Sequence, residues 1–215
     1  MTQTIEKTAF APRVRAFLED LAANNNREWF RAEKPRYDAE VRRPAEMLVD
    51  RIALRLSQRT RQRVRPKLFR LHRDVRFSND KTPFFTHLHA AWTLPDGRGW
   101  YFGLSPNYAT AAAGVMVFDE AQTQDWRAAL DSPEGGKLAA LLPELKGRMD
   151  PPPLVSPPAP YDSAHPHAEL LRHTGCLVWI DDLYHSLCVD AEAALVDTFD
   201  RLAPLQDWLA RNVAR

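Results

Sequence analysis

The densest group of ionisable side chains in this 215-residue chain lies between Arg70 and Pro83. Three arginines, one lysine, two aspartates and one histidine are interspersed there with hydrophobic residues. Arginine binds phosphate and carboxylate groups through paired hydrogen bonds, and a strand would hold several such groups in fixed positions. The segment therefore predicts a binding site for an anion. The ligand-binding residues of this prediction are Arg70, Arg73, Arg76, Asp80 and Lys81.

The same segment contains a candidate acid–base pair. His72 and Asp74 are two positions apart, and they would be the catalytic residues if the protein is an enzyme, which the sequence leaves open. A structural ion-pair network is the alternative interpretation, because such networks are common and perturb charges without catalysing a reaction. Arg73 lies on the apolar face of the predicted strand, so we expect it to pair with Asp80 or Glu28.

Alternating hydrophobicity predicts two strands around this segment. The first runs from Leu68 to Phe77 and the second from Phe84 to Leu94, with a turn between them. His87 and His89 share one face of the second strand. Together with His72 they would suit zinc and support a metal-dependent hydrolase, but such spacing is common by chance. We therefore assign no metal ligands and no cofactor from the sequence.

Helices are predicted at both ends of the chain, where apolar residues recur every three or four positions. The first begins after Pro12. The others are a long helix from about Pro35 to Ser57, kinked at Pro44, and a last helix from Asp190 to Val213, interrupted at Pro204. These helices must pack on the strands that carry the charged segment.

Capping signals and further strands complete the pattern. Asn26 is expected to cap a helical turn, and Asp119 with Gln122 has the pattern of a capping box. Three more strands are expected, at Trp100–Leu104, Ala111–Phe118 and Cys176–Ile180. Together these helices and strands predict an α+β fold, with a mostly antiparallel sheet of four to five strands packed by N- and C-terminal helices. We expect one domain over residues 1–215.

The overall composition narrows the class of partner. The formal net charge is +1, which argues against nucleic acid and leaves a small anionic ligand as the expected partner. No apolar run approaches the roughly 20 residues of a membrane helix, and Met1–Pro12 lacks the apolar core of a signal peptide. We therefore expect a cytoplasmic protein without membrane contact. No CxxC, P-loop or glycine-rich nucleotide motif is present, and the oligomeric state stays open.

Three motifs together resemble a known family. They are the segment Asn24–Phe30 followed by Lys34, Tyr37 and Pro44, the segment Arg70–Pro83, and the ending Thr198–Leu205. The chain resembles the family named domain of unknown function 2461 over nearly its whole length. The resemblance implies no activity, cofactor or partner. The family's usual Tyr and polar residue after the central motif are Phe84 and Phe85 here, which argues against a catalytic role for this turn.

The sequence thus favours a protein that binds a small anionic ligand, phosphorylated ligands included, through an Arg, Asp and Lys cluster on a strand and turn. Arg70, Arg76 and Lys81 would contact the anion. The first alternative is a non-enzymatic protein-interaction module, in which the arginine network is structural and the basic segment Arg59–Arg65 docks an acidic partner. The metal-dependent hydrolase is the second alternative.

Overall fold

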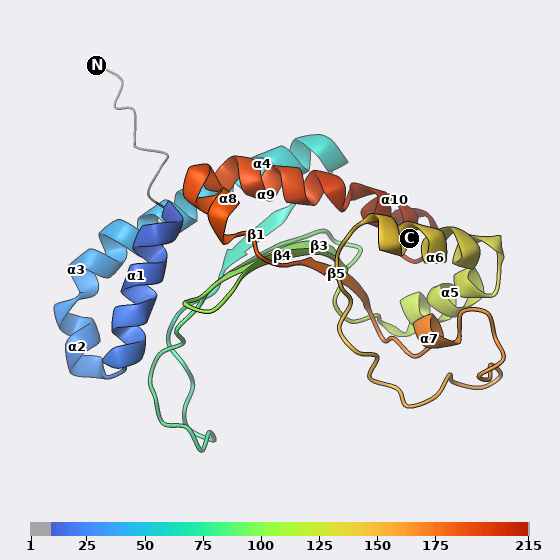
Figure 1. The fold of residues 1–215 in the computed structure, drawn as a ribbon, viewed down its shortest axis with the longest axis horizontal. Coiled ribbons are helices and arrows are strands. Elements are labelled where there is room, and N and C mark those ends of the chain that lie inside the picture. Colours follow the sequence, from blue (N-terminus) through green and yellow to red (C-terminus); the bar gives the residue numbers. More distant parts are fainter. Residues whose placement is uncertain (1–9, 215) are drawn as a thin grey trace. The chain divides into compact units, whose positions relative to one another are not determined.

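The computed structural model describes residues 10–214 and has the predicted α+β architecture. Its five strands form one antiparallel sheet in which sequence order and spatial order agree (Figure 1). The segment Met1–Pro12 examined for a signal peptide lies mostly outside the described residues. The strands are β1 (Arg65–Leu68), β2 (Leu88–Thr93), β3 (Arg98–Leu104), β4 (Ala109–Val115) and β5 (Cys176–Ile180).

Contacts within the chain group it into two compact units. The first contains the described residues up to Trp92, together with Tyr101–Ala111 and Asp181–Asp197. The second contains Thr93–Trp100, Ala112–Ile180 and the residues from Thr198 onward. Strands β3 and β4 each supply residues to both units. The expectation of a single domain over residues 1–215 stays a prediction.

The N-terminal helices of the first unit follow from local signals. They are α1 (Phe10–Ala23), α2 (Arg27–Ala32), α3 (Lys34–Arg36), the π-helical segment η2 (Tyr37–Arg42) and α4 (Arg43–Thr60). Pro12 lies in the first turn of α1, where a missing N–H costs nothing. Asn26 caps α2 as predicted, because its side chain accepts a hydrogen bond of 2.9 Å from the backbone N–H of Trp29.

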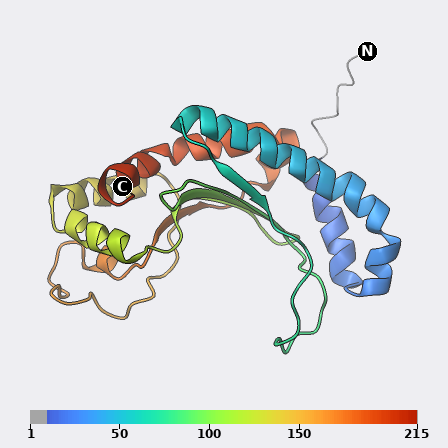
Figure 2. The same cartoon turned by 180° about the vertical axis from the view of Figure 1, so that it is seen from behind.

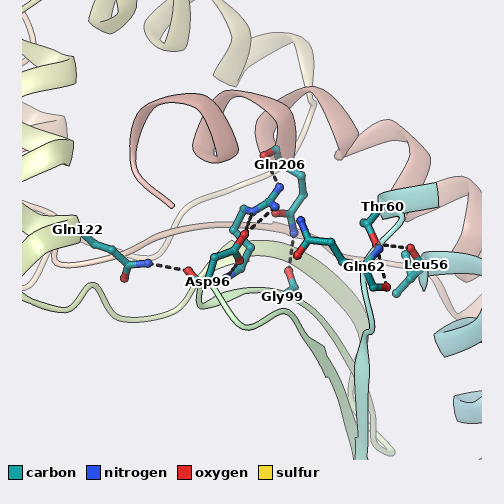
Figure 3. A network of polar contacts seen from close by, with 8 residues as sticks. Leu56, Thr60, Gln62, Asp96, Gly99, Gln122 and Gln206 are labelled. Atoms are coloured by element: carbon teal, nitrogen blue, oxygen red, sulfur yellow. Dashed lines mark hydrogen bonds and ion pairs between the residues drawn. The ribbon is translucent and has the colours of Figure 1, made fainter. Parts of the chain in front are cut away.

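The long helix predicted from Pro35 to Ser57 is irregular directly before Pro44. A proline inside a helix lacks the N–H that would bond four residues back, and its ring clashes with that carbonyl. Segment η2 relieves this conflict by widening the turn, so that the N–H of Arg43 donates to the carbonyl of Asp38. At the other end of α4, the Thr60 hydroxyl donates to the Leu56 carbonyl at 2.8 Å (Figure 3).

Helix α4 covers one face of the sheet within the first unit. The fully buried Trp92 of β2 donates its indole N–H to the Val49 carbonyl of α4 at 2.8 Å. Side chains alternate between the faces of a strand, so His89 and Ala91 point to the opposite face. The same unit contains α8 (Tyr184–Val189).

The predicted strand from Leu68 to Phe77 is wrong for most of its length. Strand β1 ends at Leu68, and residues 69–87 leave the sheet as a long hairpin, here called the arm, visible in both views (Figures 1 and 2). Only His72 and Phe84 form a strand-like bridge within it. The alternation of charged and apolar residues mimics a strand, but Phe77 is 97 % exposed and so has no core to enter.

The second unit confirms several local predictions. The capping box is present at α5 (Glu120–Leu130), where Asp119 accepts from the N–H of Gln122 and the Gln122 side chain accepts in return. Strand β5 has the predicted bounds. The C-terminal segment is split before Pro204, which lies in the first turn of α10. This unit also contains α6 (Pro133–Glu144), α7 (Ala168–Leu171) and α10 (Ala203–Asn212), while α9 (Ala191–Arg201) has residues in both units.

A buried polar network ties the turn between β2 and β3 to the helices of the second unit. Arg98, only 7 % exposed, pairs with Asp96 at 2.7 Å and donates to the Gln206 carbonyl at 3.0 Å. Gln206 donates to the Gly99 carbonyl and Gln122 to the Asp96 carbonyl, both at 2.7 Å (Figure 3). A buried charge needs such partners, and here they join α10 and α5 to the sheet. Within residues 10–214, none of the helices is both long and apolar enough to cross a membrane.

Candidate functional site

All seven sequence-predicted site residues lie in the arm, outside the five strands of the sheet; His72 forms the isolated bridge with Phe84, and Arg76 lies in the turn at the tip. Figures 1 and 2 show the arm projecting from the ends of β1 and β2. Arg70, Arg76 and Lys81 are exposed cations. The arm therefore exposes these three charged side chains to solvent.

A clasp closes the middle of the arm. The Arg73 guanidinium contacts both the Asp80 carboxylate and the Thr82 hydroxyl, so the expected Arg73–Asp80 pair is present. Asp80 also accepts from the backbone N–H of Thr82 at 2.9 Å and from its hydroxyl at 2.8 Å. The backbone N–H donated by Thr82, followed by the Arg73 guanidinium, lowers the pKa of Asp80 to about 2. The Arg73 side chain is 19 % exposed, because it is folded into this clasp.

The tip of the arm carries a second ion pair. Arg76 donates two hydrogen bonds to the Asp74 carboxylate, at 2.6 Å from Nη2 to Oδ2 and 2.9 Å from Nε to Oδ1. Hydrogen bonding from Arg76 lowers the pKa of the Asp74 carboxyl. Lys81 donates to the Val75 carbonyl at 3.1 Å. Two of the four cations in the predicted anion site, Arg73 and Arg76, are thus paired with carboxylates of the arm itself. These contacts set the shape of the arm.

The predicted catalytic pair is not brought together. Asp74 makes its contacts with Arg76, whereas the His72 ring lies edge-on to Phe30 and Phe84, with centroids at 5.6 and 4.9 Å. A general acid and base must share a proton path, and the structure joins these two side chains by no hydrogen bond. His72 belongs to an aromatic cluster at the base of the arm.

A column of rings follows the arm into β2. Phe85 stacks on His87 with centroids 4.9 Å apart, and His87 stacks on His89 at 3.8 Å with ring planes 17° apart. His89 Nε2 lies 2.7 Å from the Tyr108 hydroxyl. We call Phe85, His87, His89 and Tyr108 the ring column. Alternate positions 85, 87 and 89 signal one shared face in the sequence, but the stacking and the contribution of Tyr108 depend on the tertiary fold.

Burial favours the neutral form of both imidazoles of the ring column. It lowers the pKa of His87, and burial together with the adjacent His87 lowers the pKa of His89 to about 4. Gly103 leaves room for the contact, because a Cβ atom there would lie 3.0 Å from Tyr108 and 3.2 Å from His89. The guanidinium of Arg73 lies 5.4 Å from the Phe85 ring, so the clasp and the column touch.

The three histidines considered for a hydrolase are separated. His72 contacts Phe30 and Phe84, while His87 and His89 stack on each other. Among residues 10–214, no group of three or more His, Cys, Asp or Glu side chains could hold a metal ion. The three-histidine site of the hydrolase alternative is therefore not formed.

Comparison with known proteins places the chain in a family. Residues 13–208 match the family model described as conserved hypothetical protein (DUF2461). The chain belongs to the DUF2461 family. This match covers nearly the whole chain and confirms the resemblance seen in the three sequence motifs. Neither the curated proteins nor the solved structures contain a match to this DUF2461 chain.

The first motif of this DUF2461 member meets the base of its arm, where Phe30 contacts His72 of the central motif and Asn25 contacts Phe84 directly after it. The Asn25 side chain donates to the Phe84 carbonyl at 2.9 Å and accepts from the Phe84 N–H at 3.1 Å, as a neighbouring strand would. Phe30 stacks on the Phe84 ring with centroids 4.1 Å apart. Phe84 is buried, and its ring needs no polar partner there. Sequence reasoning missed Asn25, because its partner is 59 positions away.

Proposed function

We propose that this DUF2461 protein is a non-enzymatic interaction module whose arm docks on an acidic protein surface. The sequence favours a small anionic ligand, with an interaction module as the first alternative; a projecting arm supports the interaction module better than the binding of a small anion. The Arg76 side chain is 76 % exposed, so no walls enclose an ion at its guanidinium. Small-ligand sites are concave and bury most of the ligand surface.

The observation that carries the proposal is the composition of the tip. Phe77 is 97 % exposed, and the Arg76 guanidinium lies 5.9 Å from its ring. Aromatic residues and arginine are enriched at the centres of protein–protein interfaces, where they supply most of the binding free energy. An exposed phenylalanine at the end of a projecting hairpin therefore indicates an anchor for a partner.

The charged side chains of the arm indicate the sign of the charge on the partner surface. The described arm carries Arg70, Arg73, Arg76 and Lys81 against Asp74 and Asp80, so it keeps an excess of positive charge although Arg76 pairs with Asp74 and Arg73 with Asp80. Complementary charges raise the association rate and suppress wrong partners. The whole chain has a net charge of only +1, so it lacks the general attraction to nucleic acid of a basic protein. An acidic protein surface with an apolar pocket is the matching partner.

Site-specific photo-crosslinking in cells tests the proposal. A photoreactive phenylalanine analogue replaces Phe77 in the full chain, and the same analogue at Val155, which is 94 % exposed, serves as the control. We expect an adduct with an acidic protein from position 77 and not from position 155. Adducts that are the same from both positions would contradict a docking role for the arm.

Variants that remove positive charge from the arm distinguish an acidic protein partner from a small anionic ligand. The combined variant Arg70→Gln, Arg76→Gln and Lys81→Gln should reduce the adduct at least tenfold. A control with three exposed arginines outside the arm, Arg27→Gln, Arg31→Gln and Arg43→Gln, should leave it unchanged. A rise in melting temperature with inorganic phosphate, lost only in the arm variant, would replace the acidic protein by a small anion as the ligand.

A further inference from the structure

The outer edge of strand β5 is only partly covered. Within residues 10–214, β5 is the last strand of the sheet, so it pairs with β4 along one edge only (Figure 1). Arg148 covers the other edge at one position, because its backbone N–H and C=O exchange hydrogen bonds of 2.9 and 2.8 Å with Trp179. This bridge is isolated, so the pairing does not continue along β5.

Leu177 directs its backbone N–H and C=O to the same outer edge. Successive residues of an antiparallel strand turn these groups to opposite edges, so residues two positions apart share an edge. Leu177 lies two positions before Trp179, which bonds outward to Arg148. The Thr174 C=O accepts from the Phe118 N–H at 2.8 Å on the side of β4, as this alternation requires. The edge at Leu177 therefore offers one donor and one acceptor in fixed positions.

A pocket of about 300 Å³ lies against this edge, and all of its lining residues belong to the second unit. This volume is at the lower end of the range of small-molecule sites, which are concave and lined mostly by apolar groups. The apolar side chains of the lining are Met116, Met149, Pro151, Pro153, Leu177 and Trp179. Met116 is 51 % exposed, so a ligand in the pocket would cover apolar surface that now faces water.

The polar side chains of the pocket favour an uncharged ligand. Asp150 is paired at both carboxylate oxygens, since Oδ1 accepts from Arg148 at 2.6 Å and Oδ2 accepts from the Trp179 indole at 3.0 Å. Burial lowers the pKa of His173 and so favours its neutral imidazole. No lysine or arginine among the described residues lines the pocket, so an anion has no countercharge there. The bond to Asp150 also holds the Trp179 ring in place as a flat wall.

We propose that this pocket binds a small uncharged molecule that carries an amide group on an apolar ring. The amide C=O accepts from the Leu177 N–H, and the amide N–H donates to the Leu177 C=O, as a neighbouring strand would. The ring packs against the Trp179 indole and the two methionines, whose flexible side chains adapt to different shapes. The pocket shares no residue with the arm, so this proposal does not depend on the docking function.

Methionine methyl resonances of the isotope-labelled full chain test the proposal, with benzamide as the probe. Of the four methionines, Met116 and Met149 line the pocket, whereas Met47 lies on α4 and is 46 % exposed. We expect saturable shifts of Met116 and Met149 with a Kd of about 1 mM, as suits a ligand of so few atoms, and no shift of Met47. Unchanged resonances of Met116 and Met149, or equal shifts of Met47, would overturn the proposal.

Two analogues of the probe test the contacts with the Leu177 backbone. Methyl benzoate keeps the ring and the C=O but lacks the N–H donor, so it should bind about fivefold more weakly than benzamide. Benzoate brings a negative charge to a pocket without a cation and should bind about tenfold more weakly. Equal affinities of methyl benzoate and benzamide would refute the pairing with Leu177, and tighter binding of benzoate would refute an uncharged ligand.

A matched pair of variants places the probe in the pocket. Met116→Ala removes an exposed side chain of the lining and should weaken benzamide binding about threefold, measured from the Met149 resonance. Met47→Ala removes a similarly exposed methionine outside the pocket and should leave the affinity unchanged. The same loss of affinity in both variants, or none in Met116→Ala, would contradict binding at this site.

Discussion

Single side chains decide how the arm is held. Asn25 acts as a substitute strand for Phe84, and Arg73 closes the clasp with Asp80 and Thr82. Both devices use side chains where a sheet would use backbone. The arm therefore depends on a few hydrogen bonds whose removal has measurable consequences.

Replacing Asn25 by alanine should destabilise the protein by about 1–3 kcal/mol, because the N–H and C=O of Phe84 lose their partners in a part-buried place. Urea unfolding measures the loss. Asn24→Ala is the matched control, since Asn24 is exposed and bonds only to the nearby Asp20 carbonyl. A change below about 0.5 kcal/mol is expected there. Equal effects of the two variants would disprove the role of Asn25.

The clasp should respond to acid through Asp80. Its pKa in the folded protein is about 2, below the ordinary value of 3.8, so the carboxylate stabilises the arm above pH 3.8. This contribution is lost as pH falls from 3.8 through 2. Carboxyl NMR titration should show the low pKa directly, and Arg73→Gln should raise it only partly, since the Thr82 N–H remains. An Asp80 pKa near 3.8 in the wild type would contradict the clasp.

At the scale of elements, close packing of strands depends on glycine. Gly114 of β4 has a φ of 143°, and a Cβ atom there would lie 1.9 Å from the Cys176 carbonyl of β5. Only glycine accommodates both the backbone conformation and the approach of the neighbouring strand. The pairing of β4 with β5 thus depends on this residue.

Gly114→Ala should destabilise the protein by more than about 3 kcal/mol or prevent folding, because the strands would have to separate. Gly136→Ala provides the contrast. Gly136 lies inside α6, and the position that an alanine methyl would take has no heavy atom within 4 Å. Alanine should therefore stabilise the protein there by about 0.5–1 kcal/mol. Thermal unfolding of both variants measures the difference. A tolerated alanine at position 114 would show that β5 can shift without cost.

At the scale of the molecule, the two compact units share strands. Strands β3 and β4 each contribute residues to both units, so neither unit keeps a complete set of strands when the other unfolds. Two units that share strands are expected to unfold together in one cooperative transition. This sharing of strands favours the expectation of one domain over residues 1–215.

We expect a single unfolding transition in urea. Far-ultraviolet circular dichroism and tryptophan fluorescence should give the same midpoint, because Trp92 belongs to the first unit while Trp126 and Trp208 belong to the second. The variants Trp92→Phe and Trp126→Phe each remove one tryptophan of one unit, so the change in fluorescence amplitude shows what that unit contributes to the transition. Two separated transitions would contradict the single-domain expectation and would make each unit an independent folding body.

Features that depend on near neighbours could be predicted from the amino-acid sequence alone. The caps at Asn26 and Asp119, the interruption before Pro204 and the bounds of β5 each follow from interactions within a few residues. The family also follows from motifs that are contiguous in the chain. Such local preferences act in every context, which is why the α+β class could be predicted.

The role of the charged segment, in contrast, depends on contacts made by the folded chain. Its alternating pattern has the period of a strand, but pairing needs a neighbouring strand and a core, and residues 69–87 project from the sheet instead. The sequence predicts that His72 pairs with Asp74, but in the folded chain its ring packs against Phe30 and Phe84 instead. The ring column depends on Tyr108, which is 19 positions from His89. Contacts between distant residues are set by how the elements pack, and no local pattern encodes them.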